Sequence, residues 1–177
     1  MLSNRIQTTH LALGAAVLLT ATAVSAAQDT SATTARELAR QGLITDTHID
    51  VPYRLHEDWA DVTGATPDGD FDYQRARAGG LDVPFMSIYT PAESEAEGTS
   101  YDIANRLIDS VEALVGRAPD RFVIVRSPDQ AERAFRDGRI GLAMGLENGS
   151  PIAGRLENVA FFKQRGISYI TLALSLI

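Results

Sequence analysis

The sequence of 177 residues has no cysteine, only three histidines, and a single lysine among its 16 basic residues. Without cysteine the chain can form no disulfide bond, so a hydrophobic core has to hold the fold together. A lipid-modified cysteine after an N-terminal leader is excluded for the same reason. The sequence also lacks a Gly-x-Ser-x-Gly segment, a P-loop and a Rossmann glycine pattern, which argues against a Ser–His–Asp hydrolase and the common nucleotide-binding folds.

The first 27 residues have the pattern of a secretory signal peptide. Arg5 is the only charged side chain before residue 28, residues 11–24 are mostly apolar, and residues 25–27 (Ser-Ala-Ala) suit a cleavage site. The run falls short of the about 20 apolar residues of a membrane-spanning helix. We expect residues 1–27 to be cleaved, residues 28–41 to form a lead-in segment, and the chain to reach the periplasm or exterior of a bacterium. It would associate with a membrane only if the leader stays uncleaved.

The remaining roughly 150 residues suffice for one domain with a real hydrophobic core. The full sequence is acidic, because 23 Asp and Glu side chains against 16 Lys and Arg give a formal net charge of −7. Negative charge repels phosphate backbones and anionic lipid headgroups. Nucleic acid and anionic membranes are therefore disfavoured as partners.

Apolar segments of strand length alternate with segments of helical periodicity along this part of the chain. Near-continuous apolar strands are typical of a parallel sheet covered by helices, an α/β architecture. Residues 57–72 have the composition of a loop. Strands are expected at 43–45, 81–89, 122–125, 140–146 and 168–177, and helices at 36–41, 71–78, 101–116, 128–137 (with Ser127 as N-cap) and 156–164.

Three polar residues stand at alternate positions near the first expected strand: Asp46, His48 and Asp50. Alternate residues of a strand point to the same face, so the imidazole of His48 and the carboxylate of Asp50 converge on one point. This pair suits Zn²⁺ or a similar divalent ion. We predict His48 and Asp50 as metal ligands, with Asp46 orienting His48 from outside the ligand set. The alternative is a strand end that turns polar as it meets water.

Glu147 is a lone carboxylate at the end of the apolar segment 140–146, and Asn148-Gly149 follows it. Parallel α/β sheets and barrels keep their chemistry at the carboxyl ends of the strands. On its own, a polar strand end before an Asn-Gly turn explains the residue equally well. Right-handed connections bring both strand ends to one edge of the sheet, so His48, Asp50 and Glu147 could hold one metal ion there, or two bridged by Glu147.

Four segments together resemble the membrane (renal-type) dipeptidases, peptidase family M19. They are residues 46–52 (DTHIDVP), 77–89 (RAGGLDVPFMSIY), 145–149 (GLENG) and 165–172 (RGISYITL). Their order and spacing are similar to the N-terminal part of that family across residues 42–172. The resemblance thus covers nearly all of the chain after the leader.

The resemblance implies a (β/α)₈ TIM-type barrel, of which this chain holds the N-terminal half, and a two-zinc site that hydrolyses dipeptides. Carried over by position, His48 and Asp50 bind one zinc ion, and Glu147 bridges both ions as the catalytic carboxylate. The bridging hydroxide would attack the peptide carbonyl, whose oxygen the metals polarise. Members of the family are commonly exported, which agrees with the leader, and a homodimer remains open.

Two departures from the family pattern bear on activity. Leu174 stands where the family usually carries a substrate-contacting histidine. The family also draws two further zinc-ligand histidines, a substrate-binding arginine and another acid from sequence beyond residue 177, and such a barrel typically needs about 250 residues. We therefore expect residues 42–177 to form an incomplete barrel, truncated at its C-terminus, with weak zinc binding and little or no dipeptidase activity.

Two other functions remain open from the sequence. One is a non-catalytic exported binding module that retains the fold without the chemistry. The other is a metal-dependent barrel hydrolase of the amidohydrolase type, which would usually open with His-x-His in place of His48-x-Asp50. Nearby, His56 is a weak candidate for a further ligand because its surroundings look like a loop, and Tyr53 and Trp59 either line a substrate pocket or pack locally.

Overall fold

The computed structural model describes residues 33–172, which are divided into two units, with the boundary in the sequence between Gln41 and Gly42. In the first unit, residues 33–41 form a helix, so the helix expected at 36–41 begins at Thr33. The expected signal peptide at 1–27 and residues 173–177 lie outside the described residues. Within the described range, no helix is long and apolar enough to cross a membrane.

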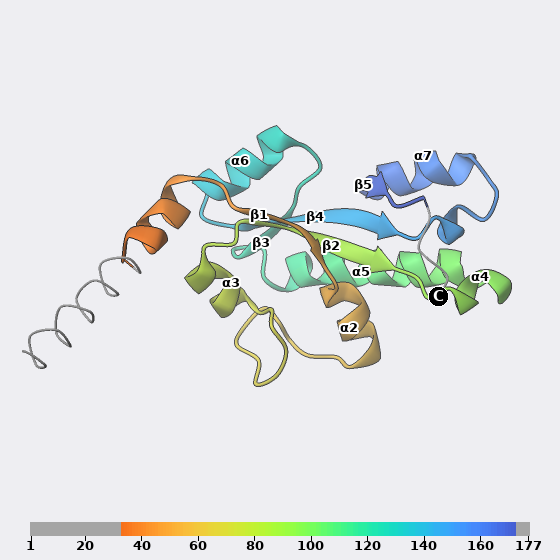
Figure 1. Ribbon diagram of the computed structural model, residues 1–177, viewed down its shortest axis with the longest axis horizontal. Coiled ribbons are helices and arrows are strands. Elements are labelled where there is room, and N and C mark those ends of the chain that lie inside the picture. Colours follow the sequence, from red (N-terminus) through yellow and green to blue (C-terminus); the bar gives the residue numbers. More distant parts are fainter. Residues whose placement is uncertain (1–32, 173–177) are drawn as a thin grey trace, which may run out of the picture. The chain divides into compact units, whose positions relative to one another are not determined.

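The second unit is built on a five-stranded parallel sheet (Figure 1). In it, β2 (Val83–Tyr89) lies between β1 (Thr45–Ile49) and β4 (Ile140–Glu147). The other edge of β4 pairs first with β3 (Phe122–Ile124) and then with β5 (Ile167–Ile170). The expected parallel α/β sheet is confirmed.

Strands β3 and β5 share one edge of β4 because successive residues of a strand direct their hydrogen-bonding groups to opposite edges. On the β2 side, the N–H of Gly141 donates to the carbonyl of Asp82 at 2.8 Å. On the other side, the carbonyl of Leu142 accepts from Val125 at 3.0 Å and that of Leu146 from Thr171 at 2.9 Å. Because β1, β2 and β4 run parallel, the carboxyl ends of β1 and β4 lie at the same end of the sheet, with β2 between them.

Helices cover both faces of this sheet (Figure 1). On one face lie α2 (Val51–Glu57) and α5 (Ser100–Arg117), and on the other α6 (Pro128–Arg136). As predicted, Ser127 caps α6, accepting a hydrogen bond from the N–H of Gln130 at 3.3 Å. The remaining helices are α3 (Tyr73–Gly79), α4 (Glu93–Ala96), the short 3₁₀ helix η1 (Ser150–Ile152) and α7 (Glu157–Gln164).

Alternation along the strands divides the apolar side chains between two cores. Met86 and Ile88 of β2 point to the α5 face and belong to the larger core. Val83 of the same strand and Ala143 of β4 point to the other face, where they pack with Ala134 of α6. Each fully buried large side chain stabilises the fold by about 1.5–3 kcal/mol. The larger core also includes Leu107, Ile108, Leu114, Phe122, Leu142, Met144, Leu146 and Phe162.

The first strand lies later in the sequence than expected. Residues 43–45 were expected to form it, whereas β1 runs from Thr45 to Ile49 and contains His48 itself. Asp50 lies outside the strand, at the N-cap position of α2. The expectation that strand alternation aligns His48 with Asp50 is therefore wrong, and a turn from strand to helix brings the two side chains together.

Helix α2 was not predicted, because its short segment looked like a loop. Pro52 occupies the first turn, where the missing proline N–H would have had no intrahelical partner. A helix of seven residues does not persist alone. Burial of Val51 and Leu55 against the sheet stabilises it, and this tertiary contact has no local signature in the sequence.

Candidate metal centre

Three side chains meet at the carboxyl edge of the sheet: His48 from β1, Asp50 from the start of α2, and Glu147 from the end of β4. The Nε2 atom of His48 lies 3.2 Å from Oδ1 of Asp50 and 3.2 Å from Oε2 of Glu147. One ligand atom from each residue lies within 4.8 Å of the others, and residues 33–172 contain no second group of this kind. The structure thus brings together the three residues that the sequence singled out as metal ligands.

A β-bulge in β1 directs His48 toward this point. Asp46 pairs with Pro84 and Ile49 with Met86, so the two residues between, Thr47 and His48, stand opposite a single residue of β2. Bulges bend a strand and re-aim its side chains, and they are frequent beside active sites. Asp46 contacts His48 through the backbone, because its Oδ1 accepts a hydrogen bond from the His48 N–H at 3.0 Å.

Ser87 of β2 holds the carboxylate of Glu147. Its hydroxyl donates to Oε2 of Glu147 at 2.6 Å, a distance typical of a charge-assisted hydrogen bond. Ser87 is fully buried, whereas 18% of the Glu147 side chain is exposed. Ser87 was not predicted from the sequence as a site residue, although its alternation with Val83 already placed it on the strand face opposite Met86 and Ile88.

The arrangement of the three groups fits a cation. The Nε2 atom of a neutral imidazole carries either one proton or one lone pair, so it can donate to only one of the two carboxylate oxygens that face it. A metal ion satisfies all three atoms at once, and a divalent ion neutralises two carboxylates. Tetrahedral zinc with bonds of about 2.0–2.1 Å has ligand atoms roughly 3.3–3.4 Å apart, close to the two 3.2 Å separations between His48 Nε2 and the carboxylate oxygens.

The cluster is open to solvent on one side, since the His48 and Asp50 side chains are 41% and 68% exposed. A cavity of about 270 Å³ lies beside it, lined by Asp50, Tyr53, Tyr89 and Glu147. The Tyr53 and Tyr89 rings meet edge to face with centroids 5.0 Å apart. Two aromatic rings therefore line the cavity next to the proposed ligands. Burial, with a further contribution from Glu57, raises the pKa of Tyr53.

Two other residues considered near the first motif lie apart from the cluster. The Trp59 ring is half exposed and packs under the guanidinium of Arg117, whose Cζ lies 5.5 Å from the ring centroid. His56 is exposed, and its ring centroid lies 6.2 Å from that of Tyr53. Of Tyr53 and Trp59, only Tyr53 lines the cavity beside the cluster, and His56 is not part of the group formed by His48, Asp50 and Glu147.

Tyr169 of β5 also reaches the site, although it was not predicted from the sequence as a site residue. Its hydroxyl donates to the carbonyl of Thr47 at 3.2 Å. Its ring lies so close to Gly145 of β4 that a Cβ atom there would overlap it. Burial raises the pKa of the Tyr169 hydroxyl, and the carboxylates of Glu147 and Asp50 raise it further. Tyr169 therefore lies within electrostatic reach of two proposed ligands.

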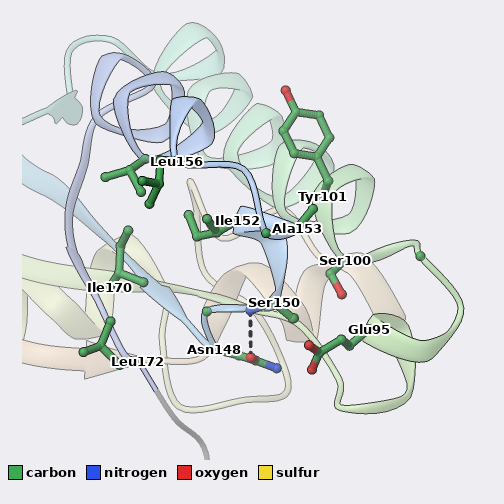
Figure 2. Close-up of a pocket in the computed structure, with 14 residues that line it drawn as sticks. Glu95, Ser100, Tyr101, Asn148, Ser150, Ile152, Ala153, Leu156, Ile170 and Leu172 are labelled. Carbon is green, nitrogen blue, oxygen red and sulfur yellow. Dashed lines mark hydrogen bonds between the residues drawn. The ribbon is translucent and has the colours of Figure 1, made fainter.

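A larger cavity of about 680 Å³ begins at the residue after Glu147. Figure 2 shows Asn148 at its edge, where the Asn148 side-chain oxygen accepts a hydrogen bond from the N–H of Ser150 at 3.0 Å. Asn148 has a φ of 84°, a left-handed conformation that asparagine tolerates better than most residues. Leu156 and Leu172 are largely exposed at the rim. Leu174, the expected departure from the family pattern, lies outside the described residues.

Sequence comparison relates this chain to known dipeptidases. It matches the family model of the membrane dipeptidases (peptidase family M19) over residues 32–176. It is 28% identical over 147 residues to dipeptidase ataJ of Aspergillus terreus, an alignment that covers 76% of this chain and 36% of that protein.

Two solved structures show the same fold. The probable dipeptidase PvdM from Pseudomonas aeruginosa matches with a TM-score of 0.70 at 19% identity, over 81% of this chain and 38% of that one. A metallopeptidase from Rhodobacter sphaeroides, liganded with a phosphinate mimic of the dipeptide L-Ala-D-Ala, matches with a TM-score of 0.63 at 21% identity, over 72% and 44%.

The chain thus spans about two-fifths of the length of these relatives, and its parallel sheet corresponds to part of a TIM-type barrel. The family model extends from residue 32 to residue 176, which includes both segments that supply His48, Asp50 and Glu147. This chain belongs to the membrane dipeptidase family, peptidase family M19.

Proposed function

We propose that His48, Asp50 and Glu147 bind zinc and that this site serves the hydrolysis of dipeptides. The observation that carries the proposal is the meeting of one imidazole and two carboxylates, with Nε2 of His48 3.2 Å from an oxygen of each. Membership of a metallopeptidase family supports the same function and disfavours the amidohydrolase-type alternative.

Each residue has a distinct task in this proposal. His48 offers the lone pair of Nε2, while Asp50 and Glu147 supply oxygen ligands and neutralise the charge of the ion. Ser87 keeps the Glu147 carboxylate in place through its 2.6 Å hydrogen bond, and we assign Glu147 as the carboxylate that a second ion would share. When bound, zinc polarises a peptide carbonyl and lowers the pKa of a water molecule. The cavity of about 270 Å³ beside Asp50 and Glu147 leaves room for part of a dipeptide.

The proposed activity is that of a whole family member, whereas this chain spans about two-fifths of its relatives. It supplies three ligands, two of which are well exposed to competing water. We therefore propose that the chain alone binds zinc weakly and hydrolyses dipeptides slowly or not at all.

Zinc titration against a chromophoric chelator tests the metal site. The chain should bind zinc, and His48→Ala and Glu147→Gln should each weaken binding about tenfold or more, since each removes a ligand. His56→Ala is the matched control, because it removes an exposed imidazole outside the cluster and should leave the affinity unchanged. Zinc binding that survives His48→Ala intact would contradict the assignment.

A panel of dipeptides, assayed with and without added zinc, tests the chemistry. Any turnover should depend on zinc and disappear in His48→Ala. Robust turnover by the chain alone would contradict the expectation of low activity, and turnover independent of His48 would contradict a metal-dependent mechanism at this site.

A further inference from the structure

Two of the strands at the site are bulged, and one side chain joins the bulges. In β1 the bulge comprises Thr47 and His48, which have no register partners of their own in β2. In β5, Ile167 pairs with Met144 and Tyr169 with Gly145, so Ser168 is the extra residue. Tyr169 follows this second bulge, and its hydroxyl donates to the carbonyl of Thr47 at 3.2 Å. The bond connects strands separated in the sheet by β4 and β2.

The peptide group between Thr47 and His48 is held at both ends. Its carbonyl accepts the hydrogen bond from Tyr169, and its N–H donates to Oδ1 of Asp46 at 3.0 Å. Regular ladder pairing is interrupted at this point, so these two side chains take the place of the missing partners. The orientation of a peptide plane determines where the next Cβ points, and here the next side chain is the imidazole of His48.

The Tyr169 ring is itself confined. On β4, a Cβ at residue 145 would overlap the ring, so only glycine leaves room for it. On β2, the Phe85 ring lies with its centroid 5.7 Å from that of Tyr169. These contacts with β4 and β2 restrict the ring, so the packing of the ring fixes the position of its hydroxyl beside the Thr47 carbonyl.

We infer that Tyr169 is a positioning residue for His48. With Asp46 it forms a clamp, namely the two hydrogen bonds to the Thr47–His48 peptide, that aims the imidazole at Asp50 and Glu147. The consequence for zinc rests on the proposed metal site, whereas the clamp itself exists without metal and is measurable without it.

The test is Tyr169→Phe, which removes the hydroxyl and keeps the ring. In the metal-free chain, the imidazole Cε1–Hε1 signal of His48, assigned by its loss in His48→Gln, should shift or broaden, and that of His56 should not. Tyr73→Phe is the matched control, because the Tyr73 ring packs on Phe122 away from the cluster and should leave the His48 signal in place. Zinc binding should weaken about fivefold in Tyr169→Phe, the effect of one hydrogen bond.

Two further variants address the same clamp from other sides. Gly145→Ala displaces the ring and should disturb the His48 signal as Tyr169→Phe does. Asp46→Ala removes the other half of the clamp at an exposed position, so it should disturb the signal without loss of folding. It keeps the inference testable even if the other two variants fold poorly.

The outcomes separate this inference from the proposed function. A His48 signal unchanged in both Tyr169→Phe and Asp46→Ala overturns the clamp, whether or not the chain binds zinc. A disturbed signal together with weaker zinc binding supports both proposals. A disturbed signal in a chain that binds no zinc supports the clamp and overturns the metal site.

Discussion

Removal of the Ser87 hydroxyl, by Ser87→Ala, should loosen the Glu147 carboxylate and weaken zinc binding. Ser87 is fully buried and donates to Oε2 of Glu147 at 2.6 Å. Alanine retains the shape of the side chain apart from one oxygen atom. The variant therefore tests the hydrogen bond with little change in packing.

The magnitude follows from the charge and exposure of Glu147. A hydrogen bond to a charged group contributes about 1.5–3 kcal/mol net. Since 18% of the Glu147 side chain is exposed, water replaces part of the lost bond, and we expect the free energy of unfolding to fall by about 1.5 kcal/mol, the lower end of that range. Loss of a hydrogen bond that orients a metal ligand typically weakens metal affinity about 10–100-fold, and the same exposure predicts about tenfold here.

Two measurements on the same protein check this prediction: urea denaturation and zinc titration against a chelator. The matched control is Ser94→Ala, since Ser94 of α4 is also buried and donates to the carbonyl of Pro91 at 2.6 Å. The control should lower stability by a comparable amount and leave zinc affinity unchanged. Native zinc affinity in Ser87→Ala, or an equal loss of zinc affinity in both variants, would refute the reasoning.

Two predictions concern the fold that supports the site. Asp72 accepts hydrogen bonds from the N–H groups of Arg75 at 2.8 Å and Thr66 at 3.1 Å; burial works to raise its pKa, but these bonds and the Arg75 charge outweigh burial and lower the pKa. The stabilisation by ionised Asp72 is therefore complete above its unfolded pKa of about 3.9, and it is lost as the pH falls through the lower pKa of the folded state. Asp72→Asn should reduce the free energy of unfolding by about 1–3 kcal/mol at neutral pH. It should also make this free energy fall less steeply in acid. Urea denaturation measures both effects, and an acid decline as steep as in the native chain would contradict the prediction. Phe162→Ala should destabilise the fold by about 3–5 kcal/mol, because Phe162 is fully buried against Tyr101. Thermal unfolding should show a smaller loss of stability for Phe161→Ala, because the neighbouring Phe161 is partly exposed. Equal losses of stability in the two variants would contradict this prediction.

Local patterns in the sequence located most elements of the sheet and its helices. The helical spacing of Leu107, Val111 and Leu114 predicted α5, and all three side chains are buried. Ser127 followed by proline predicted the start of α6. Such signals succeed because capping and amphipathicity act over a few residues. They failed for α2, whose stability depends on burial of Val51 and Leu55 against distant parts of the chain.

For the site, the sequence by itself identified the three groups that we propose as metal ligands. One imidazole and two carboxylates, those of His48, Asp50 and Glu147, stand near the ends of segments that form parallel strands. Parallel strands bring their carboxyl ends together at one end of the sheet. Only the tertiary structure decided how these groups meet. The bulge at His48, the hydroxyl of Ser87 beside Glu147, and the bond from Tyr169 to Thr47 depend on pairing between strands far apart in the chain. Register and side-chain direction arise from such non-local contacts, because a shift of one residue turns a side chain to the opposite face of the sheet.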